Sequence, residues 1–308
     1  MNVTNVVTIS DTHCGCQLSI CPPTGVRLDE GGVYTPSKFQ AKLYDIWDYF
    51  WNTWLPSEIG DEPFILVHNG DVIDGKHHDS TTQITQNLED QANIAYELLA
   101  PIVDRSSGYF HIRGTEAHVG KSGIEEERLA KRLGAKPNSI GQHARYDLWL
   151  QLGGHYINFL HHISTVSSNA YESSAVGKEL NELINECGRW GVPIPTAAVR
   201  SHRHRHCEVK VPTAKGESFI YVTPAWQLKT PFAYKIAGAR TSSPQIGGSL
   251  IRLHHSGVLY TRHFVRPIER SEIEVLDGPE EVTQVVKTAK TNAAGYRGRR
   301  TSKPQRSK

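Results

Sequence analysis

Acidic and imidazole side chains follow short apolar segments at several places in this sequence. Asp11-Thr12-His13 follows the predicted strand 5–10, whose residues 6–9 are apolar or β-branched. Side chains at positions i and i+2 of an extended segment point the same way, so Asp11 and His13 can offer an oxygen and a nitrogen to one point. A divalent metal ion needs such donors. A polar surface turn is also compatible with this motif when it is taken alone.

Four further polar clusters follow apolar segments in the same manner. They are Asn69-Gly70-Asp71-Val72-Ile73-Asp74-Gly75, Gly114-Thr115-Glu116-Ala117-His118, His161-His162 and Ser201-His202-Arg203-His204. Each cluster alone is weak, because an acid or histidine at the end of a strand is usually a solvated turn residue. Together the five clusters contain enough nitrogen and oxygen donors for two metal ions.

The elements that must position these clusters can be predicted from the hydrophobic pattern. Apolar runs predict strands at 5–10, 64–68, 109–113, 146–152, 156–160, 197–200, 218–222, 249–253 and 258–264, and Gly153-Gly154 predicts a hairpin turn. Apolar residues at helical spacing predict helices at 37–54, 85–103, 122–133 and 169–190. Strands and helices alternate in the first half and strands dominate the second, which favours an α/β or α+β fold built on layered sheets.

The ordered motifs resemble those of the calcineurin-like metallophosphoesterase superfamily. D-x-H, G-D-x-x-D, an element similar to G-N-H, a lone His and an element similar to G-H-x-H occur in that order over residues 9–204. This resemblance implies a two-sheet β-sandwich flanked by helices, in four layers, with a dinuclear metal centre along one edge.

The resemblance also implies a role for each motif residue. Asp11, His13 and His204 would bind the first metal, Asp71 would bridge the two metals, and His161 and His202 would bind the second. His161 is preferred to His162 because it follows the apolar strand directly, and His162 is the alternative.

The third motif departs from the family pattern, since Gly114-Thr115-Glu116-Ala117-His118 stands where Gly-Asn-His-Asp/Glu is usual. Glu116 would replace the missing Asn ligand at the second metal, and His118 would be the catalytic histidine, oriented by Asp74. The alternative is that this loop has degenerated. A milder departure is Ser201, which stands where a Gly usually precedes H-x-H.

The implied activity is that of a metal-dependent phosphoric ester hydrolase. Two divalent ions about 3.5–4 Å apart can lower the pKa of a water between them, and the resulting hydroxide attacks phosphorus. A protonated His118 would give the departing alkoxide its proton. A nitrogen and oxygen donor set without thiolates suits Mn²⁺ first, with Fe, Zn²⁺ or Mg²⁺ as alternatives. Arg113 and Arg203, beside the motifs, would bind the substrate phosphate.

Charge is unevenly distributed along the 308 residues. Residues 287–308 contain eight Lys or Arg and no acid, which leaves 26 basic and 32 acidic side chains for residues 1–286. We therefore expect a metallophosphoesterase domain at 1–286 and a basic, disordered tail at 287–308. The tail would contact nucleic acid through phosphates or would be a solvated end without a partner.

Composition indicates the cellular compartment in which the protein is expected. No apolar run approaches the roughly 18 residues of a membrane span, and no leader pattern begins the chain, so we expect a cytoplasmic protein without a membrane partner. Five cysteines, an odd number in a long chain, favour a reducing compartment. Cys14, Cys16 and Cys21 leave open a small zinc site, although no fourth ligand is evident.

Three functions remain open from the sequence. The basic tail favours a phosphodiesterase or nuclease. A phosphomonoesterase, including a protein phosphatase, is the alternative enzyme, although residues 70–75 lack the Arg that protein phosphatases place after the second Asp. A non-catalytic scaffold that keeps the fold is the third reading. Oligomeric state and natural substrate are not indicated.

Overall fold

The computed structural model describes residues 4–77, 79–163, 169–213, 216–236 and 244–267, which belong to one compact unit, Met1–Ile268. The predicted basic tail, 287–308, lies outside the described residues. The predicted domain boundary at residue 286 therefore stays a prediction.

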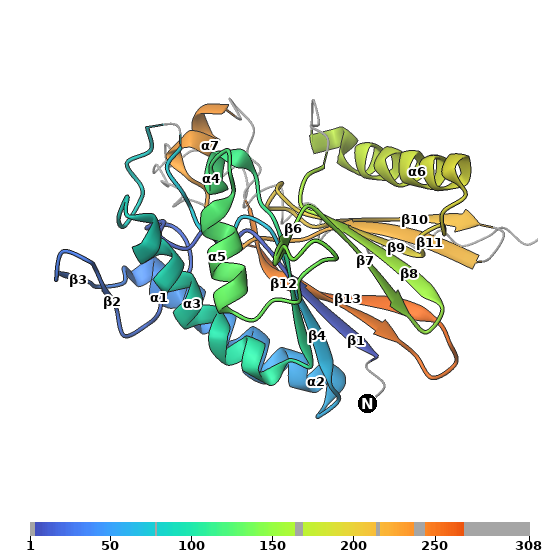
Figure 1. The fold of residues 1–308 in the computed structure, drawn as a ribbon, viewed down its shortest axis with the longest axis horizontal. Coiled ribbons are helices and arrows are strands. Elements are labelled where there is room, and N and C mark those ends of the chain that lie inside the picture. The colour runs from blue at the N-terminus through green and yellow to red at the C-terminus, as the bar shows by residue number, and fades with distance from the viewer. Residues whose placement is uncertain (1–3, 78, 164–168, 214–215, 237–243, 268–308) are drawn as a thin grey trace, which may run out of the picture. The chain divides into compact units, whose positions relative to one another are not determined.

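Six strands form the first sheet (Figure 1). In spatial order they are β13 (Leu259–Pro267), β12 (Gln245–Leu253), β1 (Asn5–Ile9), β4 (Phe64–Asn69), β5 (Gly108–Ile112) and β6 (Ala144–Arg145). The neighbours β1, β4, β5 and β6 are parallel to one another. β12 pairs with both β1 and β13 in antiparallel fashion. The carboxyl ends of β1, β4 and β5 therefore meet at one edge of this sheet.

Five strands form the second sheet. In spatial order they are β10 (Cys207–Thr213), β11 (Gly216–Val222), β9 (Ala197–Arg200), β8 (His155–Leu160) and β7 (Asp147–Leu152). β8, β9 and β11 are parallel. The predicted Gly153-Gly154 hairpin is confirmed, because Leu152 pairs with His155 across the turn between β7 and β8. A separate ribbon pairs β2 (Val26–Arg27) with β3 (Val33–Tyr34).

The sheets pack in layers because strand side chains alternate between two faces. In β1, Val7 packs against residues of the helices, while Val6 packs against side chains of the second sheet. The helices are α1 (Lys38–Tyr49), the π-helical η1 (Phe50–Trp54), α2 (Leu55–Ile59), α3 (Leu88–Arg105), α4 (Glu116–Val119), α5 (Ile124–Arg132), the 3₁₀ helix η2 (Asn169–Tyr171), α6 (Glu172–Trp190) and α7 (Pro231–Ile236).

The outer face of the second sheet is covered by α6, where Val176 and Leu180 pack on Ile220 of β11. Figure 1 shows α6 along β10 and β11, with α1, α3 and α5 beside the first sheet. The order helix, sheet, sheet, helix confirms the predicted α/β fold with a two-sheet sandwich flanked by helices.

The elements differ from the predictions in two instructive places. The helix predicted at 37–54 changes to a π-helix at Phe50, and the N–H of Leu55 bonds to the carbonyl of Phe50. Pro56 has no N–H for the carbonyl of Asn52, which disturbs the regular ladder at this point. Strand β10 was not predicted, because its mixed charged and apolar sequence lies at the edge of its sheet.

Candidate metal centre

The predicted motif residues follow the carboxyl ends of β1, β4, β5, β8 and β9. Backbone hydrogen bonds hold the loops side by side beyond the strands. The N–H of Asp11 donates to the carbonyl of Gly70 at 2.9 Å, and the N–H of His13 donates to that of Asp71 at 3.1 Å. In the second sheet, the N–H of Ser201 donates to the carbonyl of His161 at 2.9 Å. Motifs distant in sequence are thus fixed against one another.

The backbone of these loops is unusual, since several residues other than glycine have a positive φ. Six described non-glycine residues have φ between 42° and 72°, and five of them are predicted ligands: Asp11, His13, Asp71, His202 and His204, the sixth being Asp79. Side chains are disfavoured in this left-handed region, so such residues persist only where surrounding structure holds them, often at functional sites. The strain coincides with the residues that the motifs singled out.

The first group joins Asp11, His13 and His204. Nε2 of His204 lies 3.2 Å from Oδ1 of Asp11 and 3.1 Å from Nε2 of His13, and His13 Nε2 lies 3.8 Å from the same Asp11 oxygen. Their donor atoms lie close enough together to hold one metal ion. The structure therefore brings together the three residues predicted to bind the first metal.

The second group joins Asp71, His161 and His202. Oδ2 of Asp71 lies 3.0 Å from Nε2 of His161 and 3.8 Å from Nδ1 of His202. The other ring nitrogen of His161 contacts the carbonyl of Asn69 at 2.6 Å, which directs Nε2 toward Asp71. His161 is buried, whereas His162 is exposed and its ring lies against His202. This geometry favours His161 over His162.

Electrostatics and burial fit a cation at both groups. Oδ1 of Asp11 and Nε2 of His161 are buried and make no regular hydrogen bond, and each faces another predicted ligand, His204 and Asp71 respectively, so an ion bound between them would satisfy both atoms. Burial alone would raise the pKa of Asp71, but the charges of His161 and His118 hold it well below its usual value. Burial, together with neighbouring His118 and His204, lowers the pKa of His13 well below 6.5, so this ring is neutral and able to ligate.

Two glycines allow the loops to approach this closely. A Cβ on Gly70 would lie 2.3 Å from Nδ1 of His161, and a Cβ on Gly114 would lie 2.2 Å from Oδ1 of Asp71. Both positions therefore require glycine, because a side chain would take the place of a predicted ligand.

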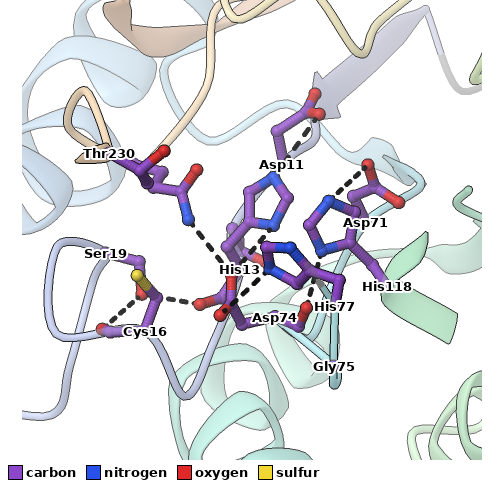
Figure 2. A network of polar contacts seen from close by, with 12 residues as sticks. Asp11, His13, Cys16, Ser19, Asp71, Asp74, Gly75, His77, His118 and Thr230 are labelled. Carbon is purple, nitrogen blue, oxygen red and sulfur yellow. Dashed lines mark hydrogen bonds and ion pairs between the residues drawn. The ribbon is translucent and has the colours of Figure 1, made fainter. Parts of the chain in front are cut away.

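His118 lies beside both groups, but its contact with Asp74 differs from the predicted one. Nδ1 of His118 contacts the backbone carbonyl of Asp74 at 2.6 Å, and Nε2 lies 4.0 Å from Oδ2 of Asp71. The carboxylate of Asp74 faces His13 and His77 instead, as Figure 2 shows. Asp74 thus contacts His118 through its main-chain carbonyl and not through the carboxylate that was predicted to orient this ring.

The structure places Glu116, the residue predicted to replace the Asn ligand, apart from the two ligand groups. Glu116 is exposed at the start of α4, and the structure does not bring its side chain into the described metal-binding groups. Thr115, which occupies the position of the family's Asn, contacts Asp71 instead: its N–H donates to Oδ1 at 2.7 Å and its hydroxyl lies 3.2 Å from the same oxygen. Thr115 therefore faces Asp71, whereas the next residue, Glu116, begins helix α4 and is exposed.

The two predicted phosphate-binding arginines face carboxylates. Arg113 lies 3.8 Å from Glu127 and donates to the hydroxyl of Tyr146 at 2.9 Å. Arg203 lies 3.9 Å from Glu172. The structure thus places both guanidinium groups in intramolecular ion pairs.

A buried glutamate that sequence analysis missed connects two of the motif loops. Glu126 of α5 is fully buried and accepts hydrogen bonds from the N–H groups of Val72 (3.3 Å) and Gly114 (2.8 Å). Its spacing from Leu129 and Leu133 places it on the apolar face of the helix, and an acid on that face is the signal that could have identified it.

The cysteines do not support the zinc alternative. Cys14, Cys16 and Cys21 are buried free thiols, and burial raises the pKa of each to about 12. A thiol must lose its proton to bind zinc, and none of the three belongs to the metal-binding groups found among the described residues.

Comparison with known proteins adds only distant structural matches. No family model and no curated protein matches the sequence. Solved structures similar to the chain include Vps29 from Chaetomium thermophilum, with 11% identity, 88% of this chain and 100% of that chain covered, and a TM-score of 0.36. A predicted phosphoesterase from Streptococcus pneumoniae has 11% identity, with 86% and 99% covered and a TM-score of 0.32. A putative 5'-nucleotidase from Staphylococcus aureus has 11% identity, with 93% and 58% covered and a TM-score of 0.39.

These identities and TM-scores are too low to argue for an activity. The chain's own layers and the convergence of its motif residues agree with the two-sheet architecture and the edge site that the sequence resemblance implies. No helix in the described part of the chain has the length and apolar character needed to cross a membrane.

Proposed function

We propose that this chain is a dinuclear metal-dependent phosphoesterase whose substrates are phosphodiesters, nucleic acids among them. The observation that carries the proposal is the convergence of six ligand residues from four strand ends into two adjacent groups. His202 links the groups, because its backbone N–H donates to Oδ2 of Asp11 at 3.3 Å while its ring faces Asp71.

Two bound divalent ions, Mn²⁺ by preference, would supply a water of lowered pKa and withdraw charge from the phosphoryl oxygens. Asp11, His13 and His204 would hold one ion, and Asp71, His161 and His202 the other. His118 is partly exposed beside them. When the ring is protonated, its Nδ1–H can donate a hydrogen bond to the carbonyl of Asp74 while its Nε2–H is available to protonate the leaving oxygen.

The charges of the described residues favour a diester over a monoester. A phosphate monoester carries close to two negative charges at neutral pH, since its second pKa is about 6, whereas a diester carries one. Arg113 and Arg203 are paired with Glu127 and Glu172 and therefore give a second negative charge little compensation. The eight basic residues of 287–308 would suit a polyanionic diester.

A substrate panel with Mn²⁺ tests the proposal. It contains bis-p-nitrophenyl phosphate, p-nitrophenyl phosphate, cyclic nucleotides, and single- and double-stranded DNA. We expect turnover of the diesters and loss of all turnover in Asp71→Ala, with Asp147→Asn on the exposed face of β7 as the matched control. Turnover of the monoester alone would exclude a diesterase and favour a phosphomonoesterase.

Metal analysis tests the non-catalytic alternative. An enzyme of the proposed kind binds close to two equivalents of Mn²⁺, and a scaffold would bind less than one. Substoichiometric binding together with no turnover on the whole panel would overturn the proposed function.

A further inference from the structure

The carboxylate of Asp74 is buried among donors from separate segments of the chain. Oδ2 accepts a hydrogen bond from Nε2 of Gln83 at 2.9 Å and lies 3.5 Å from Nε2 of His77. Oδ1 accepts from Nε2 of Gln227 at 3.2 Å and lies 3.6 Å from Nδ1 of His13. The two glutamine amides therefore fix the carboxylate, and one of its oxygens remains directed at His13.

His13 lies between two carboxylates (Figure 2). Its Nε2 faces Asp11 and His204 in the first metal-binding group, while its Nδ1 faces Asp74. Nδ1 is buried and has no hydrogen-bond partner at ordinary distance. Nε2 of His13 is therefore the nitrogen that would bind the metal, and Nδ1 is the nitrogen on the supporting side of the ring, which faces Asp74.

The chemistry of imidazole decides what the supporting side can do. A neutral imidazole has one lone pair and one N–H, so a ring that binds a metal through Nε2 must carry its proton on Nδ1. His13, Asp74 and His118 also lie close enough to form a third metal-binding group. A neutral His13 ring cannot serve that group and the first group together, because it has only one nitrogen with a free lone pair.

We propose that Asp74 is a positioning residue for the metal ligand His13, through a carboxylate–imidazole–metal arrangement that Gln83 and Gln227 hold in place. A carboxylate that accepts the second ring proton fixes the tautomer and orientation of a ligating histidine and raises its basicity. This inference rests on the proposed function, since it assigns the second partner of a residue proposed to bind metal.

The support that Asp74 gives His13 can be tested apart from its contact with His118, because the first involves the side chain and the second the main chain. His118 contacts the backbone carbonyl of Asp74, which every side-chain substitution leaves in the chain. Asp74→Asn keeps the size of the side chain and removes its charge. It should therefore disturb His13 while leaving the contact of His118 and the second metal-binding group unchanged.

Calorimetric titration of the metal-free protein with Mn²⁺ measures both sites. In Asp74→Asn we expect the affinity of one site to fall about 10- to 100-fold while the other keeps its wild-type value. Asp147→Asn, which removes an exposed carboxylate on β7, is the matched charge control and should leave both affinities unchanged. Unchanged affinities in Asp74→Asn would overturn the proposal, and so would an equal loss at both sites, which indicates general damage.

A spectroscopic measurement gives an answer that does not depend on metal. Nitrogen NMR of the metal-free protein should show His13 protonated on Nδ1 in the wild type and a mixture of tautomers in Asp74→Asn. A wild-type ring protonated on Nε2 would overturn the proposal. Failure of the proposed function would look different, because a wild-type protein that bound no Mn²⁺ would still report its His13 tautomer.

Discussion

Metal binding at the second group should release a proton from His161. Burial by itself lowers the pKa of this ring, but the charge of Asp71, whose Oδ2 lies 3.0 Å from Nε2, outweighs burial and raises the pKa to about 10. His161 is therefore protonated in the metal-free protein at neutral pH. A metal ligand must be neutral, so each ion bound here displaces about one proton.

The pKa sets the size of the effect. It lies about three units above pH 7, and each unit corresponds to about 1.4 kcal/mol, so removing the proton costs about 4 kcal/mol and lowers the apparent affinity about a thousandfold. As the pH rises the cost falls, so the apparent association constant should increase about tenfold per pH unit between about pH 6 and pH 8. His13 should release no proton, because its pKa lies well below 6.5.

The assay is calorimetric titration with Mn²⁺ in buffers of different ionisation enthalpy, which counts the protons released. His162→Asn is the matched control, because His162 is exposed and should leave the release from His161 intact. His161→Asn should abolish both the release and the steep pH dependence of the second site. An affinity that does not change between about pH 6 and pH 8, or a binding event without proton release, would refute the reasoning.

Three further predictions address the supports of the site. Gly114→Ala should abolish binding of the second ion, counted by metal analysis, because its Cβ would meet Asp71 at 2.2 Å, whereas Gly188→Ala, with open space around it in α6, should bind both ions normally. Glu126→Ala should lower the free energy of unfolding by about 2–4 kcal/mol in urea titrations, since it leaves the buried N–H of Val72 and the partly buried N–H of Gly114 without their acceptor, and an effect below about 0.5 kcal/mol would contradict this. Removal of residues 287–308 should weaken DNA cleavage in a salt-dependent manner while leaving bis-p-nitrophenyl phosphate turnover unchanged, and an equal loss on both substrates would show that the tail is not an accessory.

The elements and the motif positions could be predicted because both depend on local pattern. Each predicted strand overlaps an observed strand, since alternating and continuous apolar runs report which faces are buried. A strand end is also where a buried chain first meets solvent, so polar residues there are visible in the sequence. This reasoning placed Asp11, His13, Asp71 and His118 on loops that the structure brings together.

The contacts within the site could not be predicted from spacing. Thr115 and Glu116 are neighbours in sequence, but α4 begins at Glu116. The backbone N–H of Thr115 therefore still faces Asp71, whereas the side chain of Glu116 is exposed. Arg113 and Arg203 were predicted from their positions beside motifs, but the acids paired with them come from other elements, helices α5 and α6.

The sequence by itself determined that this chain alternates strands with helices and ends five strands in acids, histidines or both. Both features follow from which residues of each segment are buried, and the local order of apolar and polar residues indicates that burial. Only the tertiary structure decided that Asp74 turns its carboxylate to His13 rather than to His118, and that Glu126 connects two loops. These contacts depend on where segments distant in sequence meet in space. The residues around a side chain in the sequence do not indicate which distant residue it will contact.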